Sequence, residues 1–317
     1  MSNVSFSIII PVYNRPYEID ELLASIEKQS YDKPFEIIVV DDGSLEEKRC
    51  DFIIEKYSAT LHVKYFYKPN SGAGLSRNFG MEKATENYYI ILDSDVILPQ
   101  NYLTSVHETL SNNYTDIYGG PDAAHPDFST LQKAINYAMT SFWTTGGLRG
   151  GKNNKDFQPR SFNLGMSKEV YEETNGFSDR KIGEDIDFSF RVKSKGFTSQ
   201  LIPEAFVYHK RRSTLSQFFN QTFAFGKERP KLSKAFPKTN KITYWFPSLF
   251  LFGLILSILL FTYGCFLPIL MYGLYLAIVF LGSSITNKSI SVGLASIVTT
   301  LVQFSGYGLG FIKGLLL

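Results

Sequence analysis

The feature that most limits how this chain can fold is a long uncharged stretch near its carboxyl end. Between Ile242 and Asn287 there is no Asp, Glu, Lys, Arg or His, and beyond this stretch only Lys288 and Lys313 are charged. Uncharged apolar segments of about 20 residues are long enough to cross a membrane as helices. The sequence therefore predicts a membrane-spanning region over residues 242–317, with candidate spans at 244–266, 267–285 and 290–312.

A basic cluster lies directly before the uncharged stretch. Only Glu228 opposes its members, which are Lys227, Arg229, Lys231, Lys234, Lys238 and Lys241. Residues 213–241 are therefore predicted to form an amphipathic segment next to the membrane. The positive-inside rule places residues 1–241 in the cytoplasm, at the inner face of a cell membrane. The carboxyl terminus lies outside if all three spans cross, and the short connection from Gly264 to Pro268 leaves a re-entrant hairpin as the alternative.

The rest of the chain is electrically balanced. Taking Lys288 and Lys313 from the 32 basic residues leaves 30, against 30 acidic residues, all within 1–241. This balance gives no strongly basic face for nucleic acid. Cys50 and Cys265 lie in different regions, so we expect no disulfide framework and a reducing compartment. The first apolar run is short and lacks a basic flank, so it indicates a strand and not a secretory signal.

Strands and helices alternate over the first part of the chain. We expect strands at 6–10, 35–40 and 63–67, a helix beginning at Pro16, and a second helix over 46–57. Ile19, Leu22 and Ile26 recur at helical spacing and give the first helix an apolar face. The alternation predicts an α/β domain with a mostly parallel sheet over residues 1–212.

Two carboxylates follow a further buried strand. The apolar run 88–92 leads into Asp93, Ser94 and Asp95. Residues i and i+2 of an extended segment share a face, so both carboxylates point the same way. One interpretation is a site for a divalent cation that also holds phosphate. The other is a helix-capping turn.

Residues 70–80 contain glycines that open a helix, followed by Arg77 and Asn78. Such a helix start can bind an anion, and a guanidinium adds a forked donor for phosphate. An ordinary loop before a surface helix is the alternative. The chain lacks G-x-G-x-x-G after its first strand and lacks a P-loop, which disfavours hydride transfer and ATP hydrolysis.

The order of these motifs resembles family 2 glycosyltransferases of the GT-A fold, of the membrane-anchored bacterial type. The resemblance covers residues 5–212 and rests on the following segments, in this order: Pro11-Val12-Tyr13-Asn14, Asp41-Asp42-Gly43-Ser44, Arg77-Asn78, Asp93-Ser94-Asp95, Asn163-Leu164-Gly165, Asn175-Gly176-Phe177 and Glu184-Asp185-Ile186-Asp187.

The resemblance implies a nucleotide-sugar donor, with UDP as the expected nucleotide. A divalent cation, Mn²⁺ or Mg²⁺, would bind its diphosphate through Asp93 and Asp95, and a cation bridging these oxygens would stabilise the departing charge. His209 is a candidate third ligand, with a structural histidine as the alternative. The residues expected to contact the donor are Pro11, Tyr13, Asn14, Asp41, Asp42, Arg77, Asn78, Asp93 and Ser94.

The resemblance also implies the base. Asp185 would take the proton from an acceptor hydroxyl, with Glu184 beside it, and direct displacement would invert the anomeric centre. Neighbouring like charges with partial burial can raise the pKa of a carboxyl group toward working pH. Acidic residues in the first turn of a helix are also common because they complement the helix dipole, so capping is the alternative for both residues.

The acceptor side is less defined by sequence. Gly120 follows a predicted strand and would allow close approach of a sugar, with a simple turn as the alternative. Asn163 and Gly165 belong to the motif set, and Trp143 lies in a motif-free segment, 124–159, that we expect on the acceptor side. The sequence Gln221-Thr222-Phe223-Ala224-Phe225 does not match the Q-x-x-R-W pattern of processive synthases, which favours addition of a single sugar.

The predicted activity is therefore transfer of one sugar to a glycan acceptor, which we expect to be lipid-linked, in the synthesis of a surface polysaccharide. Two alternatives belong to other classes. One is a membrane component that binds a nucleotide sugar without catalysis. The other is a nucleotidyltransferase, which would call for a glycine-rich basic loop after the first strand.

Overall fold

The computed structural model describes residues 4–146, 159–180, 182–237 and 240–317. The chain forms two compact units. The first consists of Met1–Ala123 and Lys152–His209, and the second of Ala124–Gly151 and Lys210–Leu317. Residues 147–158 of the motif-free segment, and Lys238 of the basic cluster, lie outside the described residues.

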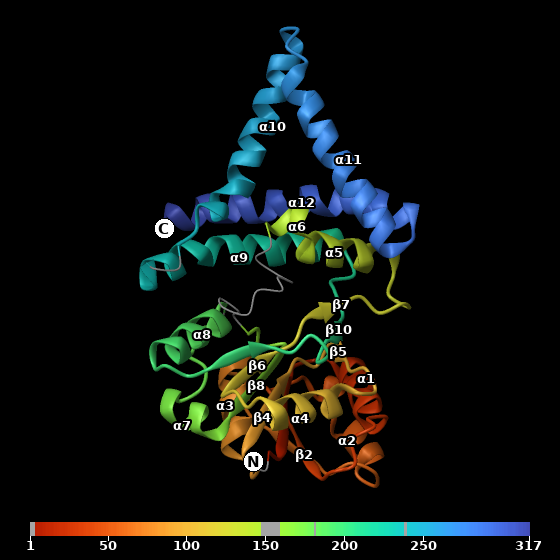
Figure 1. Ribbon diagram of the computed structural model, residues 1–317, viewed down its shortest axis with the longest axis vertical. Coiled ribbons are helices and arrows are strands. Elements are labelled where there is room, and N and C mark those ends of the chain that lie inside the picture. Colours follow the sequence, from red (N-terminus) through yellow and green to blue (C-terminus); the bar gives the residue numbers. More distant parts are fainter. Residues whose placement is uncertain (1–3, 147–158, 181, 238–239) are drawn as a thin grey trace. The chain divides into compact units, whose positions relative to one another are not determined.

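A seven-stranded sheet forms the centre of the first unit (Figure 1). Four of its strands are parallel and adjacent, in the order β3-β2-β1-β4. They are β1 (Phe6–Val12), β2 (Phe35–Asp41), β3 (Val63–Tyr67) and β4 (Tyr88–Leu92). Every residue of β1 and β4 is buried, which explains their continuous apolar sequences, because parallel strands are covered on both faces. The predicted α/β architecture is confirmed.

Helices cover this sheet and set the positions of the loops between strands. They are α1 (Pro16–Glu27), α2 (Asp51–Tyr57), α3 (Ala73–Glu82) and α4 (Tyr102–Asn112). α1 buries Ile19, Leu22 and Ile26, as their spacing predicts. α3 lies very close to the sheet at Gly80, where a Cβ atom would come within 2.5 Å of Ile9. This close packing fixes the second half of α3 against the sheet, less than one turn after Arg77.

The predicted helix over 46–57 is wrong in part. A 3₁₀ turn at Glu46–Lys48 is followed by a break, and α2 starts only at Asp51. Cys50 lies in the break and is fully buried, with its Sγ 4.0 Å from Oδ2 of Asp41. The chain turns inward at Cys50, so a continuous amphipathic helix cannot form there.

Short strands complete the first unit. β8 (Asn163–Ser167) lies antiparallel to β4, and the sheet continues through β6 (Ile117–Gly119) to β9 (Ser199–Leu201). A second sheet contains β5 (Val96–Ile97), β10 (Val207–His209) and β7 (Asp122–Ala123), in the order β5-β10-β7. Two helices, α7 (Lys168–Thr174) and α8 (Glu184–Ser194), lie between β8 and β9 along the chain. These strands are too short for their sequence to reveal their direction.

The second unit is helical. Its helices are α5 (Thr130–Thr140), α6 (Phe142–Thr145), α9 (Leu215–Ala235), α10 (Phe246–Thr262), α11 (Leu267–Asn287) and α12 (Ile290–Leu315), with a 3₁₀ turn at Ile242–Trp245. Thr214 caps α9, and its hydroxyl accepts a hydrogen bond from the Gln217 backbone N–H. Within the described residues, three stretches are long and apolar enough to cross a membrane: Ile242–Thr262, Leu267–Asn287 and Ile290–Leu315.

Within this unit α9 and α12 run side by side, and α10 and α11 rise from them to meet at a tip (Figure 1). Glycines line the contact between α9 and α12. A Cβ atom at Gly310 would come within 2.1 Å of the carbonyl oxygen of Phe223, and one at Gly314 within 2.2 Å of that of Lys227. The two helix backbones therefore touch directly, as small residues allow.

We expect Gly310→Ala to destabilise the second unit, because its methyl group must displace backbone atoms of α9. Overpacking of this kind costs about 1–3 kcal/mol. Gly273→Ala in α11 is the matched control, since a Cβ atom there meets nothing within 4 Å and alanine is the better helix former. Thermal unfolding in detergent should show a lower melting temperature for the first variant alone. Equal melting temperatures would contradict the described contact.

Candidate functional site

Polar side chains converge at the edge of the sheet where the parallel strands end. β1, β2 and β4 run in the same direction, so the loops at 13–15, 42–44 and 93–95 emerge together. α3 and α8 contribute Arg77 and Glu184 to the same place, where Arg77 contacts both Asp93 and Glu184. This edge of the first unit is the candidate active site.

Asp93, Asp95 and His209 form a cluster suited to a cation. One ligand atom from each lies within 4.8 Å of the others. The second sheet explains how residues so distant in sequence meet, because β10 pairs antiparallel with β5 and places His209 opposite Val96, next to Asp95. Nε2 of His209 lies 3.3 Å from Oδ1 of Asp95. The structure thus brings together the three residues that the sequence suggested as metal ligands.

Two buried polar atoms of this cluster have no hydrogen-bond partner in the described part of the protein, which fits a cation site. Oδ1 of Asp95 and Nδ1 of His209 are both buried without a hydrogen-bond partner. Burial alone would raise the pKa of Asp95, but the adjacent His209 and Arg15 outweigh it and hold this pKa well below its usual range. Asp95 is therefore an anion at neutral pH. Carboxylate oxygens with an imidazole nitrogen are a donor set that accepts Mn²⁺ or Mg²⁺.

Arg15 occupies the other side of Asp95. Its guanidinium forms an ion pair with Oδ2 of Asp95, which leaves Oδ1 facing His209. Arg15 directly precedes α1, whose first residue is Pro16, so its backbone is held at the rim of the site. Arg15 and His209 thus contact different oxygens of one carboxylate. This position had no assigned role in the sequence-based prediction, although it adjoins Tyr13 and Asn14.

Arg77 connects the two acidic motifs. Its Nη2 lies 2.7 Å from Oδ1 of Asp93, and its Nη1 lies 2.9 Å from Oε1 of Glu184. The side chain is only 3% exposed, and its guanidinium lies over the ring of Phe177. A planar fork of this kind can hold two carboxylates at once. Arg77 therefore keeps the strand end carrying Asp93 next to the start of α8.

Replacing Arg77 by methionine should destabilise the first unit strongly. The substitution keeps most of the volume but leaves Asp93 and Glu184 without their shared cation, and breaking a buried ion pair costs about 3–5 kcal/mol. We expect a clear fall in the melting temperature. Lys56→Met is the control, since Lys56 pairs with Asp20 at an exposed position where such pairs add little. Equal stability of the two variants would rule out this role of Arg77.

Glu184 and Asp185 differ in their surroundings. Burial raises the pKa of Glu184, an effect that Arg77 partly offsets and Asp185 reinforces. Asp185 has a looser ion pair, with its Oδ2 3.4 Å from Nη1 of Arg160, and its Oδ1 accepts a hydrogen bond from the Ile186 backbone N–H. Glu184 is therefore fixed by a buried partner, whereas Asp185 keeps a weakly paired oxygen.

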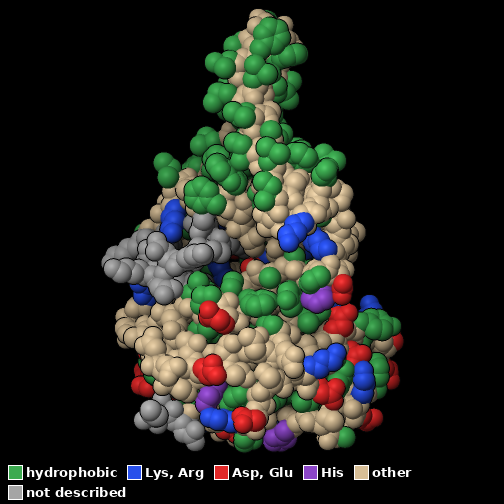
Figure 2. All heavy atoms as spheres, turned by 45° about the vertical axis from the view of Figure 1, so that its right-hand side comes forward, with side chains coloured by type: hydrophobic (Ala, Val, Ile, Leu, Met, Phe, Trp, Pro, Cys, Tyr) green, Lys and Arg blue, Asp and Glu red, His purple; other side chains and the backbone are tan. Residues whose placement is uncertain are grey.

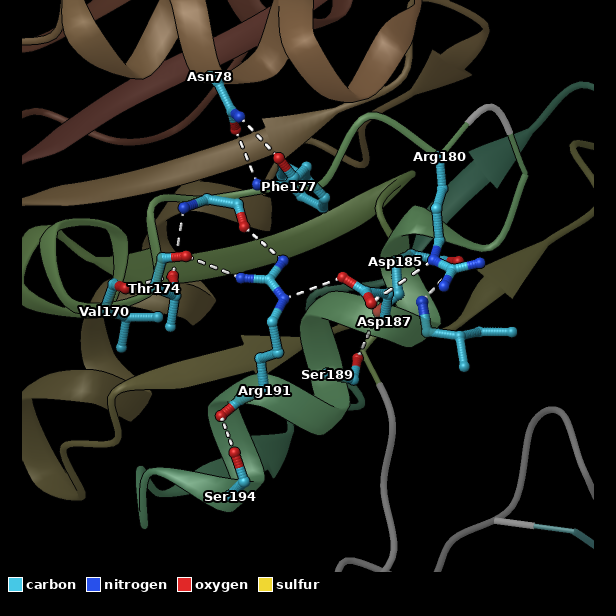
Figure 3. Close-up of polar contacts among 12 residues, drawn as sticks. Asn78, Val170, Thr174, Phe177, Arg180, Asp185, Asp187, Ser189, Arg191 and Ser194 are labelled. Carbon is cyan, nitrogen blue, oxygen red and sulfur yellow. Dashed lines mark hydrogen bonds and ion pairs between the residues drawn. The ribbon is translucent and has the colours of Figure 1, made fainter. Parts of the chain in front are cut away.

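α8 itself is anchored by a separate network (Figure 3). Asp187 accepts a hydrogen bond from Nε of Arg191 at 2.9 Å, and Arg191 also donates to the carbonyl oxygens of Thr174 and Gly176. Arg180 lies 3.6 Å from the other oxygen of Asp187. Asp187 thus secures the helix, which leaves Glu184 and Asp185 as the carboxylates at its start.

Asn78 supports the same region. Its amide accepts from the Phe177 backbone N–H and donates to the Phe177 carbonyl oxygen, both at 2.8 Å (Figure 3). A Cβ atom at Gly176 would come within 2.3 Å of its Oδ1. Both ends of this amide are therefore used by one backbone segment. In this structure Asn78 positions that segment, and its contact with a nucleotide stays a prediction.

Asp41 and Asp42 both accept hydrogen bonds from loops on the side of the site where the nucleotide is expected. Asp41 is fully buried, and its oxygens accept hydrogen bonds from the Ser44 backbone N–H and the Tyr65 hydroxyl. Asp42 accepts from the backbone N–H groups of Ser71 and Gly72 and pairs with Lys68. Burial would raise the pKa of Asp42, but Lys68 and the N–H donors outweigh it and lower this pKa.

Four further residues were expected beside the donor. Tyr13 is 49% exposed at the sheet edge. Asn14 adopts a left-handed conformation, with φ of 54°, and its side-chain oxygen accepts from the Leu45 backbone N–H. Pro11 is buried within β1, and Ser94 is buried between the two site aspartates. Tyr13 is thus the one among these four with an exposed side chain.

Three residues expected on the acceptor side are enclosed by protein. Asn163 is fully buried, accepting from the Tyr102 hydroxyl and donating to the Ala205 carbonyl oxygen. A Cβ atom at Gly165 would lie 1.9 Å from the Tyr118 ring, and one at Gly120 would lie 1.7 Å from the Ala205 carbonyl oxygen. Close packing within the protein surrounds all three residues, and their contact with an acceptor stays a prediction. Trp143 lies in α6 of the second unit and is half exposed.

Parts of this chain are similar in sequence to known proteins. The sequence model described as Glycosyl transferase family 2 matches residues 7–174. Chondroitin synthase of Pasteurella multocida is 27% identical over 241 residues, which cover 66% of this chain and 25% of that protein. Poly(ribitol-phosphate) beta-N-acetylglucosaminyltransferase TarS of Staphylococcus aureus is 33% identical over 117 residues, which cover 36% of this chain and 20% of that protein. The matched part thus spans a quarter or less of each of these two relatives.

Solved structures share the fold. Mannosyltransferase PcManGT from Pyrobaculum calidifontis, in complex with GDP-Man and Mn²⁺, superposes with a TM-score of 0.62 at 15% identity, covering 94% of this chain and 87% of that one. TarS 1–349 of S. aureus in complex with UDP-GlcNAc gives 0.51 at 20% identity, covering 71% and 66%. Because the family model matches more than half of the 317 residues, this chain belongs to glycosyl transferase family 2.

Proposed function

We propose that this chain is an inverting glycosyltransferase that moves one sugar from a nucleotide sugar to an acceptor at the cytoplasmic face of a membrane. The observation that carries the proposal is the pair of contacts made by Arg77, which joins Asp93 of one acidic motif to Glu184 of the other. Arg77 therefore holds two kinds of side chain at one edge of the sheet. Those of the first acidic motif are suited to hold a diphosphate, and the second motif contains a carboxylate suited to accept a proton.

The cation cluster supports the donor half of the reaction. A divalent cation held by Asp93, Asp95 and His209 would supply positive charge where the diphosphate departs. Arg15 is a further cationic side chain at the same place, paired with Asp95. Tyr13, two residues before Arg15 in the chain, has an exposed ring. We infer that these residues orient the donor so that its anomeric carbon faces the start of α8.

Asp185 is the base in this proposal. Glu184 is committed to the buried Arg77, whereas the contact of Asp185 with Arg160 is longer, at 3.4 Å. Asp185 would take the proton of an acceptor hydroxyl as that oxygen bonds to the anomeric carbon and the bond to the diphosphate breaks. A single displacement of this kind inverts the anomeric centre.

We propose UDP as the nucleotide and a lipid-linked glycan as the acceptor. The TarS structure with UDP-GlcNAc supports the first choice by similarity, and PcManGT with GDP-Man makes GDP the other nucleotide to test. The long apolar helices support the second choice, because an enzyme held at a membrane meets acceptors that are held there too.

A screen of nucleotide sugars tests the activity. The purified chain, incubated with UDP-GlcNAc, UDP-glucose or GDP-mannose, should release a nucleoside diphosphate from one of them when Mn²⁺ or Mg²⁺ is present. Binding of a nucleotide sugar without any release would favour a non-catalytic component. Release of pyrophosphate from a nucleoside triphosphate and a sugar phosphate would instead identify a nucleotidyltransferase.

The acceptor is tested separately. Membranes containing the chain should transfer radiolabelled sugar from the donor into material that extracts into organic solvent. Membranes carrying Asp185→Asn are the control for other transferases. Label found only in water-soluble products would contradict the lipid-linked acceptor while leaving the transferase activity standing.

A further inference from the structure

The helices of the second unit differ in whether they can enter a membrane. α9 cannot cross, because its last nine residues include Lys227, Glu228, Arg229, Lys231 and Lys234. Charged side chains are costly in the hydrocarbon core of a bilayer. α9 must therefore lie at the surface, with its charged side chains in contact with water and lipid head groups.

α12 is held at the same depth as α9 over its second half. Gly306, Gly310 and Gly314 contact α9 near Thr222, Phe223 and Lys227, respectively. The contact advances in the same direction along both helices, so it is a lengthwise contact and not a single crossing point. Since Gly314 meets Lys227 itself, the carboxyl end of α12 lies beside the charged end of α9.

The first half of α12 is held by another polar helix. The Thr299 hydroxyl donates a hydrogen bond of 3.1 Å to the Ala134 carbonyl oxygen of α5. α5 carries Gln132, Lys133 and Asn136, so it is unsuited to the hydrocarbon core. Thr299 and Thr300 are fully buried. α12 is thus the apolar centre of a layer formed by α5, α9 and α12, which we call the platform.

α10 and α11 are covered by other parts of the protein much less than α12 is. In their most apolar windows only 17% and 11% of residues are buried, against 39% for α12. Figure 2 shows hydrophobic side chains along this hairpin, without charged side chains on the visible face. Its two arms, Ile242–Thr262 and Leu267–Asn287, contain 21 residues each. At 1.5 Å per residue each arm is about 31 Å long, which matches the hydrocarbon thickness of a bilayer.

We propose that, of the described helices, only the α10–α11 hairpin crosses the membrane, while the platform lies along the cytoplasmic head-group layer. Lipid hydrocarbon covers the surface of the hairpin, and the basic residues of α9 bind anionic lipid. The carboxyl terminus then lies on the same side as residues 1–241. This proposal differs from the expectation of an outside carboxyl terminus, which requires all three apolar segments to cross. The inference does not depend on the proposed catalytic activity.

The two native cysteines make the topology testable in the intact chain. Cys265 is exposed at the hairpin tip, whereas Cys50 is buried. In whole cells with an opened outer envelope, a membrane-impermeant maleimide should label the wild-type chain, and Cys265→Ser should abolish this labelling. In the Cys265→Ser background, Leu317→Cys should be labelled only after the membrane itself is opened. Ser58→Cys, at an exposed position in the first unit, is the matched control for the inner side.

Each alternative arrangement gives its own result. Labelling of Leu317→Cys in unopened cells would mean that α12 crosses and would overturn the platform. If neither Cys265 nor Ser58→Cys were labelled from outside, the hairpin would not cross and would be re-entrant. Labelling of Ser58→Cys from outside would mean that the whole orientation is inverted. The proposal stands only if Cys265 is reached from outside and positions 58 and 317 from inside.

Discussion

Asp185→Asn is expected to lower the rate of sugar transfer by about 10²–10⁴-fold, the usual contribution of a positioned base. Asparagine keeps the size of the side chain and can still accept the hydrogen bond from the Ile186 backbone N–H, but it cannot take a proton. Asp185 is not part of the cation cluster, so the dissociation constant of the donor should stay near that of the wild type. Initial rates and calorimetric titration with donor measure the two effects separately.

Glu173→Gln is a suitable control for this variant. It makes the same carboxylate-to-amide change on α7, at an exposed ion pair with Lys195, and should leave both rate and donor affinity unchanged. Near-normal turnover of Asp185→Asn would remove Asp185 as the base. Glu184→Gln would then be the next variant to measure.

Asp95→Asn should abolish activity by a different route. The amide removes one negative charge from a buried position that faces both His209 and Arg15. A neutral oxygen is a weaker ligand for a hard cation, so we expect the affinity for Mn²⁺ and for the donor to fall together. Titration calorimetry with Mn²⁺, in the presence and absence of nucleoside diphosphate, measures this loss.

Asp127→Asn provides the comparison for Asp95→Asn. Asp127 is 90% exposed, so the same substitution there should leave metal and donor affinity unchanged. If Asp95→Asn kept the wild-type affinity for both, the cluster of Asp93, Asp95 and His209 would not be the cation site. The melting temperature of each variant distinguishes a lost ligand from a lost fold.

The central part of the fold could be predicted from sequence because its strands are buried on both faces. A short continuous apolar run such as 88–92 is typical of a strand in a covered parallel sheet, and the helical spacing of Ile19, Leu22 and Ile26 marks the intervening helix. The site followed from the same logic, since carboxylates at the ends of parallel strands must lie at one edge. Asp93 and Asp95 are there, with His209 beside them.

Contacts between distant segments could not be predicted in this way. Arg77 was assigned to a nucleotide, but its two partners are carboxylates of this chain, one of them 107 residues away. Asn78, Asn163 and Gly165 lie in motifs and also make close contacts with other segments of this chain, which motif membership does not reveal. Arg160 follows the motif-free segment, so no sequence signal linked it to Asp185.

The apolar tail shows a related limit. By composition the segment at 290–312 resembles the two before it, and length alone makes all three candidate spans. What distinguishes α12 is the set of glycines and hydroxyl side chains that fit it against α9 and α5. Such residues are also common in spanning helices that pack together. The helices that contact α12 therefore had to be known before it could be distinguished from a spanning helix.

Release of nucleoside diphosphate by the purified chain, before and after removal of divalent cations, tests the central claim most directly. We expect release from a nucleotide sugar to stop in a chelator and to return when Mn²⁺ or Mg²⁺ is added back. Asp95→Asn should show no such recovery, while Asp127→Asn should behave as the wild type does. Full release in the chelator, or full recovery in Asp95→Asn, would contradict a cation site at Asp93, Asp95 and His209.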